Sequence, residues 1–166
     1  MNEINTSKEI RAAIKQGDAH KVKKLIEQNN GAIDLITPFG TWLHVASSRG
    51  QLEIVQLLVS LGADVNRRAG VFDGTALNEA ANEGHLSIVE FLLACNGIMD
   101  TSEPERNPLF SAIISGNQEI VKRLLDSGID ASVRYSGKNM DGMDAYDFAI
   151  ERGQIDIAKM LKPYRK

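Results

Sequence analysis

The chain has 166 residues, of which 43% are hydrophobic and 25% are charged, and its net charge at pH 7 is −3. This composition is typical of one globular domain, and no apolar run approaches the ~18 residues that indicate a membrane-spanning helix. The N-terminus, MNEINTSKEI, lacks the apolar core of a secretory signal and the single cysteine, Cys95, excludes an internal disulfide, so we expect a cytoplasmic protein.

Two helices are predicted before residue 30. Thr6 and Glu9 have the spacing of a capping box, which predicts a helix that begins at about Ser7. The next helix, around residues 20–27, reads HKVKKLIE and is rich in lysine. Because the end of a stacked helical array needs a polar outer face, we interpret these lysines as an end cap rather than a ligand site.

The stretch from Asp73 to Gly97 contains the clearest pair of helices. Thr75 is placed to cap the first helix and Gly84 to end it. A second helix with apolar residues at helical spacing follows, and Gly97 is expected to end it in the left-handed conformation. Two helices this short cannot bury their apolar faces alone, so the pair predicts stacked copies.

Copies of this pair recur along the whole chain. Each copy has a glycine after its first helix, and these glycines stand at intervals of 33, 34, 32 and 37 residues, at Gly17, Gly50, Gly84, Gly116 and Gly153. An apolar pair such as Leu92 and Leu93 follows each of them. A unit of about 33 residues built from a turn and two helices is a known repeat period.

The motifs of these copies identify a family. The sequence reads TWLHVA at 41–46, TALNEA at 75–80, NPLFSA at 107–112 and GADVN at 62–66. The chain therefore resembles the ankyrin-repeat family, whose signature is TPLHxA. The resemblance implies one all-α domain over residues 1–166, an ankyrin-repeat solenoid of five helix-turn-helix repeats with short projecting turns. We place these repeats at approximately 6–36, 37–69, 70–102, 103–136 and 137–166.

The chain departs from the family pattern at several positions. Phe110 and Asp147 replace the histidine that joins neighbouring turns in this family, so we expect the third and fourth junctions to be held differently. Trp42 replaces a small residue or proline. The last turn, 130–142, is about four residues longer than the others, which is either a finger that touches a partner or a harmless insertion.

The resemblance also implies that a partner is bound by the turns and by the groove that the first helices line. Trp42 is the sharpest candidate because the fold does not need a tryptophan there, and partial packing against Phe39 is the alternative. Aromatic and arginine side chains are common interface anchors. The full set of candidate contacts is Trp42, Arg49, Arg67, Arg68, Phe72, Asn78, Glu79, Asn82, Glu83, Phe110 and Tyr135.

The centre of the chain is strongly acidic. Residues 73–106 hold seven acidic residues against one arginine, a local net charge of −6. This charge indicates either a negative field in the groove or an ordinary solvated surface. A negative groove predicts a partner with a basic surface.

Several chemistries are not supported by the sequence. The three histidines, His20, His44 and His85, stand at unrelated places, and no phosphate-binding loop is present. Glu79 and Glu83 share a helix face, but an open groove solvates such a pair and does not supply a dry catalytic pocket. Basic residues are interrupted by the acidic centre, which disfavours nucleic-acid binding. We therefore expect no enzyme activity, no cofactor, no metal, no nucleic acid and no membrane partner.

The sequence thus predicts a protein-protein interaction module, a monomer when free. One hypothesis for its role is a small inhibitor or immunity protein that neutralises a toxin or enzyme. An adaptor or scaffold without inhibitory activity is a second hypothesis, and a host-directed effector is a third.

Overall fold

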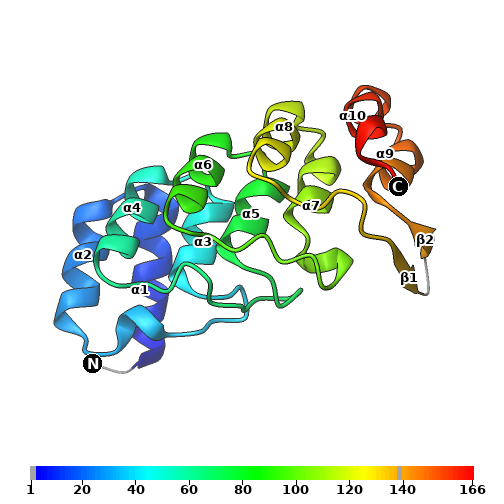
Figure 1. The fold of residues 1–166 in the computed structure, drawn as a ribbon. Helices are drawn as coiled ribbons and strands as arrows, with labels where there is room; N and C mark the ends of the chain where they lie inside the picture. The colour runs from blue at the N-terminus through cyan, green and yellow to red at the C-terminus, as the bar shows by residue number, and fades with distance from the viewer. Residues whose placement is uncertain (1–2, 138–139) are drawn as a thin grey trace.

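The computed structural model describes residues 3–137 and 140–166, and within these ranges ten α-helices form five successive pairs (Figure 1). The pairs are α1 (Glu3–Gln16) with α2 (Ala19–Gln28), α3 (Trp42–Ser48) with α4 (Leu52–Ser60), α5 (Ala76–Asn82) with α6 (Leu86–Ala94), α7 (Pro108–Ser115) with α8 (Gln118–Asp126), and α9 (Ala145–Glu151) with α10 (Ile155–Leu161). The short 3-10 turns are η1 (Ala32–Asp34), η2 (Pro104–Arg106) and η3 (Lys162–Tyr164). The predicted all-α repeat architecture is confirmed.

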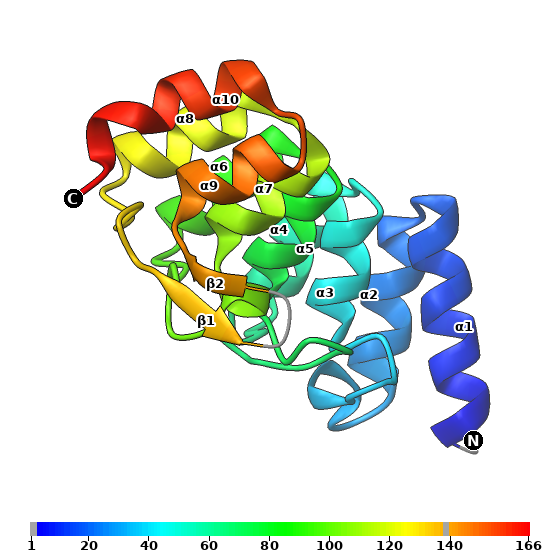
Figure 2. The ribbon, with the colours of Figure 1, turned by 90° about the vertical axis from the view of Figure 1, so that its right-hand side faces the viewer.

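The helices pack in two rows. The first helices contact one another in the order α1, α3, α5, α7 and α9, and the second helices in the order α2, α4, α6, α8 and α10. Figure 2 shows the first row side by side. Small buried residues such as Ala46, Ala80 and Ala112 let the first helices approach closely, while Ile88 and Ile120 fill the core between the rows. Each such large side chain contributes about 1.5–3 kcal/mol through burial.

The backbone conformation at the end of α5 requires a glycine. Gly84 has a φ of +80°, in the left-handed region, and the other four closing glycines are also in this region. The end of α6 differs from our expectation. Asn96, with a φ of +60°, takes the left-handed conformation, and Gly97 does not. Gly97 is needed because a Cβ there would lie 2.7 Å from the Leu92 carbonyl oxygen.

The first helix also begins earlier than predicted. Helix α1 starts at Glu3, so Thr6 lies inside it and does not cap it. Thr6 is buried, and its hydroxyl donates to Asn29 Oδ1 at 3.4 Å. The prediction was wrong because the capping-box spacing does not reveal that Thr6 faces the neighbouring helix. The lysines of α2 are exposed, as an end cap requires.

His44 joins the second repeat to the third. Its Nε2 lies 3.1 Å from the Gly74 carbonyl oxygen and must carry the proton, because a carbonyl only accepts. Nδ1 then accepts from the Thr41 hydroxyl at 2.8 Å and from the Thr41 amide at 3.3 Å. Burial lowers the pKa of His44, and the bond to Gly74 offsets this only in part. His44 is therefore neutral in the folded chain.

The low pKa of His44 predicts a pH-dependent stability. Below the ordinary histidine pKa of 6.5, the unfolded chain binds a proton at this position more readily than the folded chain does. The contribution to stability is therefore complete above this pH and is lost as the pH falls toward the folded-state pKa. We expect His44→Asn to remove a slope of up to about 1.4 kcal/mol per pH unit. Urea unfolding of both proteins at several pH values between about 5 and 8 measures this difference, and identical profiles would contradict it.

Asn78 makes the equivalent junction in the next repeat. Its Oδ1 accepts from the Thr75 amide at 3.1 Å and from the Thr75 hydroxyl at 3.0 Å, while Nδ2 donates to the Arg106 carbonyl oxygen at 2.5 Å. These contacts repeat those of His44 one repeat further on. We expected Asn78 to contact a partner, but its side chain is buried and its polar atoms are occupied by the fold.

Substitutions of Asn78 test this role. Asn78→Ala leaves the Thr75 donors and the Arg106 carbonyl without their partner, and we expect a loss of about 1–3 kcal/mol in the free energy of unfolding. Asn78→His is the matched control, because His44 makes the same three contacts in the preceding repeat. It should keep most of the stability in a urea titration. Equal stability of Asn78→Ala and the wild type would disprove the junction.

The junction at Phe110, which follows that of Asn78, is held by aromatic residues. The Tyr135 hydroxyl accepts from Asn107 Nδ2 at 2.9 Å and donates to the Thr101 carbonyl oxygen at 2.7 Å. The ring of Phe110 meets Tyr135 edge to face at 5.1 Å and stacks on Phe148 at 4.6 Å between centroids. Phe110 and Tyr135 are both buried, so each contributes to the fold at this position.

The contacts at Asp147, in the last repeat, are built from charges. Asp144 is buried, caps α9 through the Asp147 amide at 2.9 Å, and pairs with Arg134 and Arg165 at 3.0 Å each. Burial alone would raise the pKa of Asp144, but the amide hydrogen bond and the two guanidinium groups hold it below its ordinary value. Asp147 also pairs with Arg165, at 2.7 Å. The C-terminal segment is thereby tied to the last repeat.

The long last turn contains a hairpin that the sequence did not predict. Strands β1 (Tyr135–Gly137) and β2 (Met140–Met143) pair antiparallel, with Tyr135 opposite Met143 and Gly137 opposite Met140. Lys138, one of the residues of the expected finger, lies outside the described residues. The hairpin projects beside α9 at the end of the first row (Figure 2).

Candidate protein-binding surface

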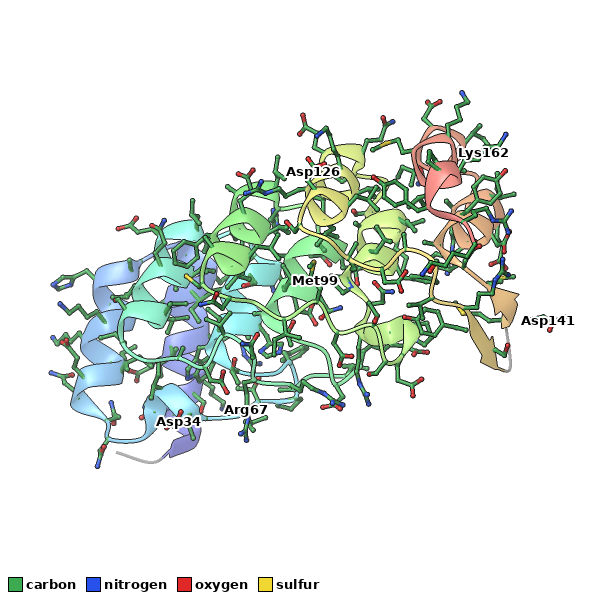
Figure 3. All side chains as sticks on the ribbon, viewed as in Figure 1. Asp34, Arg67, Met99, Asp126, Asp141 and Lys162 are labelled. Atoms are coloured by element: carbon green, nitrogen blue, oxygen red, sulfur yellow. The ribbon has the colours of Figure 1, made fainter. Side chains whose placement is uncertain are left out.

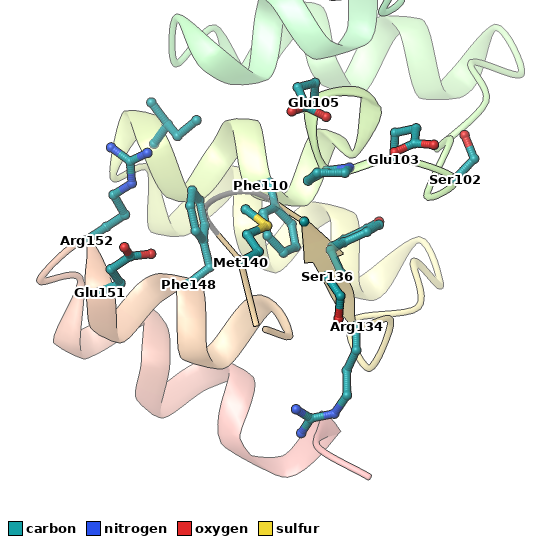
Figure 4. Close-up of a pocket in the computed structure, with 14 residues that line it drawn as sticks. Ser102, Glu103, Glu105, Phe110, Arg134, Ser136, Met140, Phe148, Glu151 and Arg152 are labelled. Carbon is teal, nitrogen blue, oxygen red and sulfur yellow. The ribbon is translucent and has the colours of Figure 1, made fainter. Parts of the chain in front are cut away.

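Two adjoining pockets lie along the first helices in the C-terminal half of the chain. The larger one, of about 610 Å³, is bounded by η2, α7, the hairpin and α9, and we call it the aromatic pocket (Figure 4). The smaller one, of about 140 Å³, lies between α5, η2 and α7, and we call it the acidic pocket. Both pockets share Pro104, Glu105 and Ile114, so together they form one groove.

The floor of the aromatic pocket is apolar. Phe110, Phe148 and Met140 point toward one another there, as Figure 4 shows. Phe110 stands where the family signature has a histidine, so one of the departures from the family pattern contributes to this floor. Ile114, 50% exposed, continues the apolar surface into the acidic pocket. This surface can receive an apolar side chain of a partner.

The rim of the groove is negatively charged. Glu103, Glu105 and Glu151 line the aromatic pocket, while Glu79 and Glu105 line the acidic pocket. None of these four carboxylates forms an ion pair with any residue that the structure describes. Glu83, exposed and on the same helical face as Glu79, adds to the charge. The groove therefore presents a negative potential to a partner.

The two arginines of the aromatic pocket change this balance little. Arg134 extends away from the apolar floor in Figure 4 and pairs with Asp144 and Asp147. Arg152 lies over the Phe148 ring, with its guanidinium carbon 4.9 Å from the ring centroid. Arg134 is thus neutralised by the fold, and Arg152 is outnumbered by the three carboxylates that line the same pocket.

The environment of Glu79 disfavours its ionised form. Partial burial raises the pKa of Glu79, and the negative charge of Glu83 raises it further. Both effects disfavour the ionised form, and no ion pair within the described residues compensates them. A cationic group that enters the acidic pocket would favour the ionised carboxylate.

The structure brings six of the candidate residues to the groove. Phe72, Asn78, Glu79 and Asn82 line the acidic pocket, whereas Phe110 and Tyr135 line the aromatic pocket. Phe72 is 64% exposed and is available to a partner. Glu83 lies beside the groove and accepts a hydrogen bond from Asn82 Nδ2 at 3.2 Å.

The basic candidates lie elsewhere. Arg49 is exposed at the end of α3 and lines neither pocket. Arg67 lies near Asp34 at the edge formed by the turns (Figure 3). Arg68 forms an ion pair with Asp73, and its Nε donates to the Asp73 carbonyl oxygen at 3.2 Å. The basic candidates therefore lie outside the groove.

The expected exposure of Trp42 is wrong. Its side chain is 0% exposed, and Nε1 donates to the Ala32 carbonyl oxygen at 2.8 Å. Phe39 is 59% exposed, and the guanidinium carbon of Arg11 lies over its ring, 4.7 Å from the centroid. Trp42 thus anchors the η1 turn to the second repeat and cannot meet a partner.

Several groove residues were missing from the candidate set. Phe148, Pro104, Glu105 and Ile114 all line the groove. Ile114 stands two residues before a closing glycine, where the repeat turns a side chain toward the groove, so the pattern does predict its place there. Phe148 gave no such signal, since only the stacking on Phe110 brings it to the pocket.

Among residues 3–137 and 140–166 no cluster of three or more histidine, cysteine, aspartate or glutamate side chains is arranged to hold a metal ion. In the same residues no helix has the length and apolar character that would let it cross a membrane. Cys95 is a half-buried free thiol.

The stacked helix pairs and the long groove define a helical repeat protein of the protein-binding class. The family model for ankyrin repeats (3 copies) matches residues 10–103 and 77–165. The chain therefore belongs to the ankyrin-repeat family, and as such it is a protein-protein interaction module.

Relatives of known description contain this module within different proteins. The chain is 31% identical over 157 residues to palmitoyltransferase AKR1 of Lachancea kluyveri, covering 90% of this chain and 21% of that protein. It is 32% identical to protein fem-1 homolog A-like of Mus musculus over 61% of this chain and 15% of that protein. Protein phosphatase 1 regulatory subunit 27 of Mus musculus is 33% identical over 55% of this chain and 60% of its own length. The chain thus spans less than two thirds of each of these relatives.

Proposed function

We propose that the chain binds a basic segment of a partner protein in the groove and inhibits that partner by occupying the segment. The observation that carries this proposal is the coincidence of an apolar floor with four lining carboxylates that lack an ion pair among the described residues. Apolar surface supplies affinity at an interface, and unpaired charge steers a partner of opposite charge to it.

Inhibition follows from the surface that such a groove would cover. Basic segments of toxins and other enzymes often bind anionic substrates, so a chain that occupies the segment blocks the substrate. The name of one relative, a regulatory subunit of a protein phosphatase, supports a role in controlling an enzyme by binding it. In this proposal the free chain is a monomer that meets its partner in the cytoplasm.

Capture followed by an activity assay tests the proposal. The immobilised chain is exposed to native lysate at low and high salt, in parallel with Glu79→Lys/Glu83→Lys and with Glu53→Lys/Glu119→Lys. The last pair changes two exposed carboxylates on α4 and α8, outside the groove, by the same charge. We expect one stoichiometric partner that is lost at high salt and with the groove variant, retained with the control, and inhibited at a 1:1 ratio.

Two outcomes would contradict the proposal. Equal capture by all three proteins would exclude the acidic groove as the binding site. Stoichiometric binding that leaves the partner fully active would exclude inhibition and favour the adaptor or scaffold hypothesis.

A further inference from the structure

The acidic pocket has the size and the lining residues to accept one cationic side chain. Its apolar walls are Phe72, Pro104 and Ile114, and its carboxylates are Glu79 and Glu105, with no cationic residue in its lining. The long stem of an arginine or lysine packs well on apolar surface while its charged end seeks an acceptor. The exposed ring of Phe72 adds a face for a cation.

The aromatic pocket has different chemistry and a larger volume. Its floor consists of Phe110, Phe148 and Met140, and at about 610 Å³ it exceeds the acidic pocket more than fourfold. Stacked rings and a methionine favour an apolar, polarizable occupant. The two pockets meet at Pro104, Glu105 and Ile114, so one short segment of chain reaches both.

We infer that the partner presents an extended segment with two anchors, a bulky apolar side chain in the aromatic pocket and an arginine or lysine in the acidic pocket. This inference rests on the proposed function and names the chemistry of the segment it binds. The charge of the groove favours a cationic anchor, because Glu79, Glu103, Glu105 and Glu151 line it without an ion pair among the described residues. Of the two arginines in the lining, Arg134 is paired with Asp144 and Asp147, which leaves Arg152 to oppose this charge. The positive charge of this anchor stabilises the ionised form of Glu79 and so opposes the burial and the Glu83 charge that raise its pKa.

The segment is a peptide rather than a separate small molecule because the two pockets are continuous and demand two chemically different side chains. An extended chain advances about 3.3 Å per residue, so two anchors a few residues apart span adjoining pockets. Apolar anchors of this kind contribute most of the affinity of many interfaces.

A random library of linear dodecapeptides displayed on phage tests the inference. Selection is carried out on the wild-type chain, on Ile114→Arg and on Ile155→Arg. Ile114 lines both pockets, so an arginine there fills their junction and repels a cation. Ile155 is the matched control, because it is equally exposed (51% against 50%) but lies on α10 outside the groove. Circular dichroism confirms that both variants fold.

We expect the wild type and Ile155→Arg to select peptides in which a bulky apolar residue stands within a few positions of an arginine or lysine. Ile114→Arg should select none of them. In a synthetic peptide of the consensus, replacing either anchor by alanine should weaken binding by about 30-fold, the loss typical of an interface anchor. Glu79→Gln/Glu105→Gln should abolish the preference for the cation and keep the preference for the apolar residue.

Peptides without the two anchors, an empty selection, or equal selection by Ile114→Arg would overturn the inference. The failure of the proposed function is distinguishable from this result. If the captured partner is lost with Glu79→Lys/Glu83→Lys but retained with Ile114→Arg, the acidic groove binds and the two-anchor segment is wrong. If neither variant affects capture, the proposed function itself fails.

Discussion

Trp42→Ala is expected to lower the free energy of unfolding by about 3–5 kcal/mol, the range for truncation of a fully buried aromatic side chain. Trp42 is the largest buried side chain of the core and has no exposed surface. Its loss opens a cavity between α3 and η1 and leaves the Ala32 carbonyl oxygen without its donor. Urea unfolding followed by far-ultraviolet circular dichroism measures the change.

Trp42→Phe separates packing from hydrogen bonding. The phenylalanine keeps much of the volume but cannot donate to Ala32, so we expect a smaller loss, of about 1–3 kcal/mol. If Trp42→Ala is as stable as the wild type and loses binding instead, the tryptophan is an interface residue and its buried position is wrong.

Glu79→Lys/Glu83→Lys is expected to weaken binding of the partner by at least about 100-fold at low salt. The change replaces two carboxylates of the groove by cations and so sets like charges against the basic segment. Most of the loss should appear in the association rate, because surface charges steer the encounter. Surface plasmon resonance with the captured partner measures both rate constants.

Glu53→Lys/Glu119→Lys again serves as the control, because it changes the net charge equally without altering the groove. An equal loss of affinity in both pairs would show that net charge alone governs the interaction. High salt should reduce the difference between the groove variant and the wild type, since screening weakens long-range attraction.

The repeat architecture could be predicted because the sequence repeats its own local signals. The closing glycines recur at nearly constant intervals, and the structure gives each of them the left-handed backbone that ends a first helix. Apolar residues such as Ile88 and Ile120 recur at the same place and fill the core. Features that recur in every repeat could therefore be predicted from the pattern.

The site was harder to predict because it depends on contacts between repeats. Trp42 was interpreted as exposed because its burial depends on η1, ten residues away and irregular in sequence. Asn78 was interpreted as a partner contact because its equivalence to His44 appears only when the hydrogen bonds to the next turn are seen. The sequence does not predict the hairpin, because β1 and β2 are too short to show an alternating pattern.

The charge density of the sequence left open whether the acidic centre forms a negative groove or a solvated surface, and it gave no indication of an apolar floor. Phe110 and Phe148 stand 38 positions apart in sequence and meet only because α7 and α9 are neighbours in the first row. Their stacked rings form the apolar floor of a pocket at a position where the chain departs from the family signature. The combination of this floor with Glu79, Glu103 and Glu105 is what directs the proposal toward a basic, partly apolar segment.

Hydrogen exchange of the chain, free and bound to its captured partner, tests the central claim most directly. If the groove binds the partner, amides of α5, η2, α7 and the hairpin should become protected, while those of α4, α6 and α8 on the second row should keep their free-state exchange. Protection confined to the second row, or to the turns around Arg67, would place the interface elsewhere and contradict the acidic groove as the binding site.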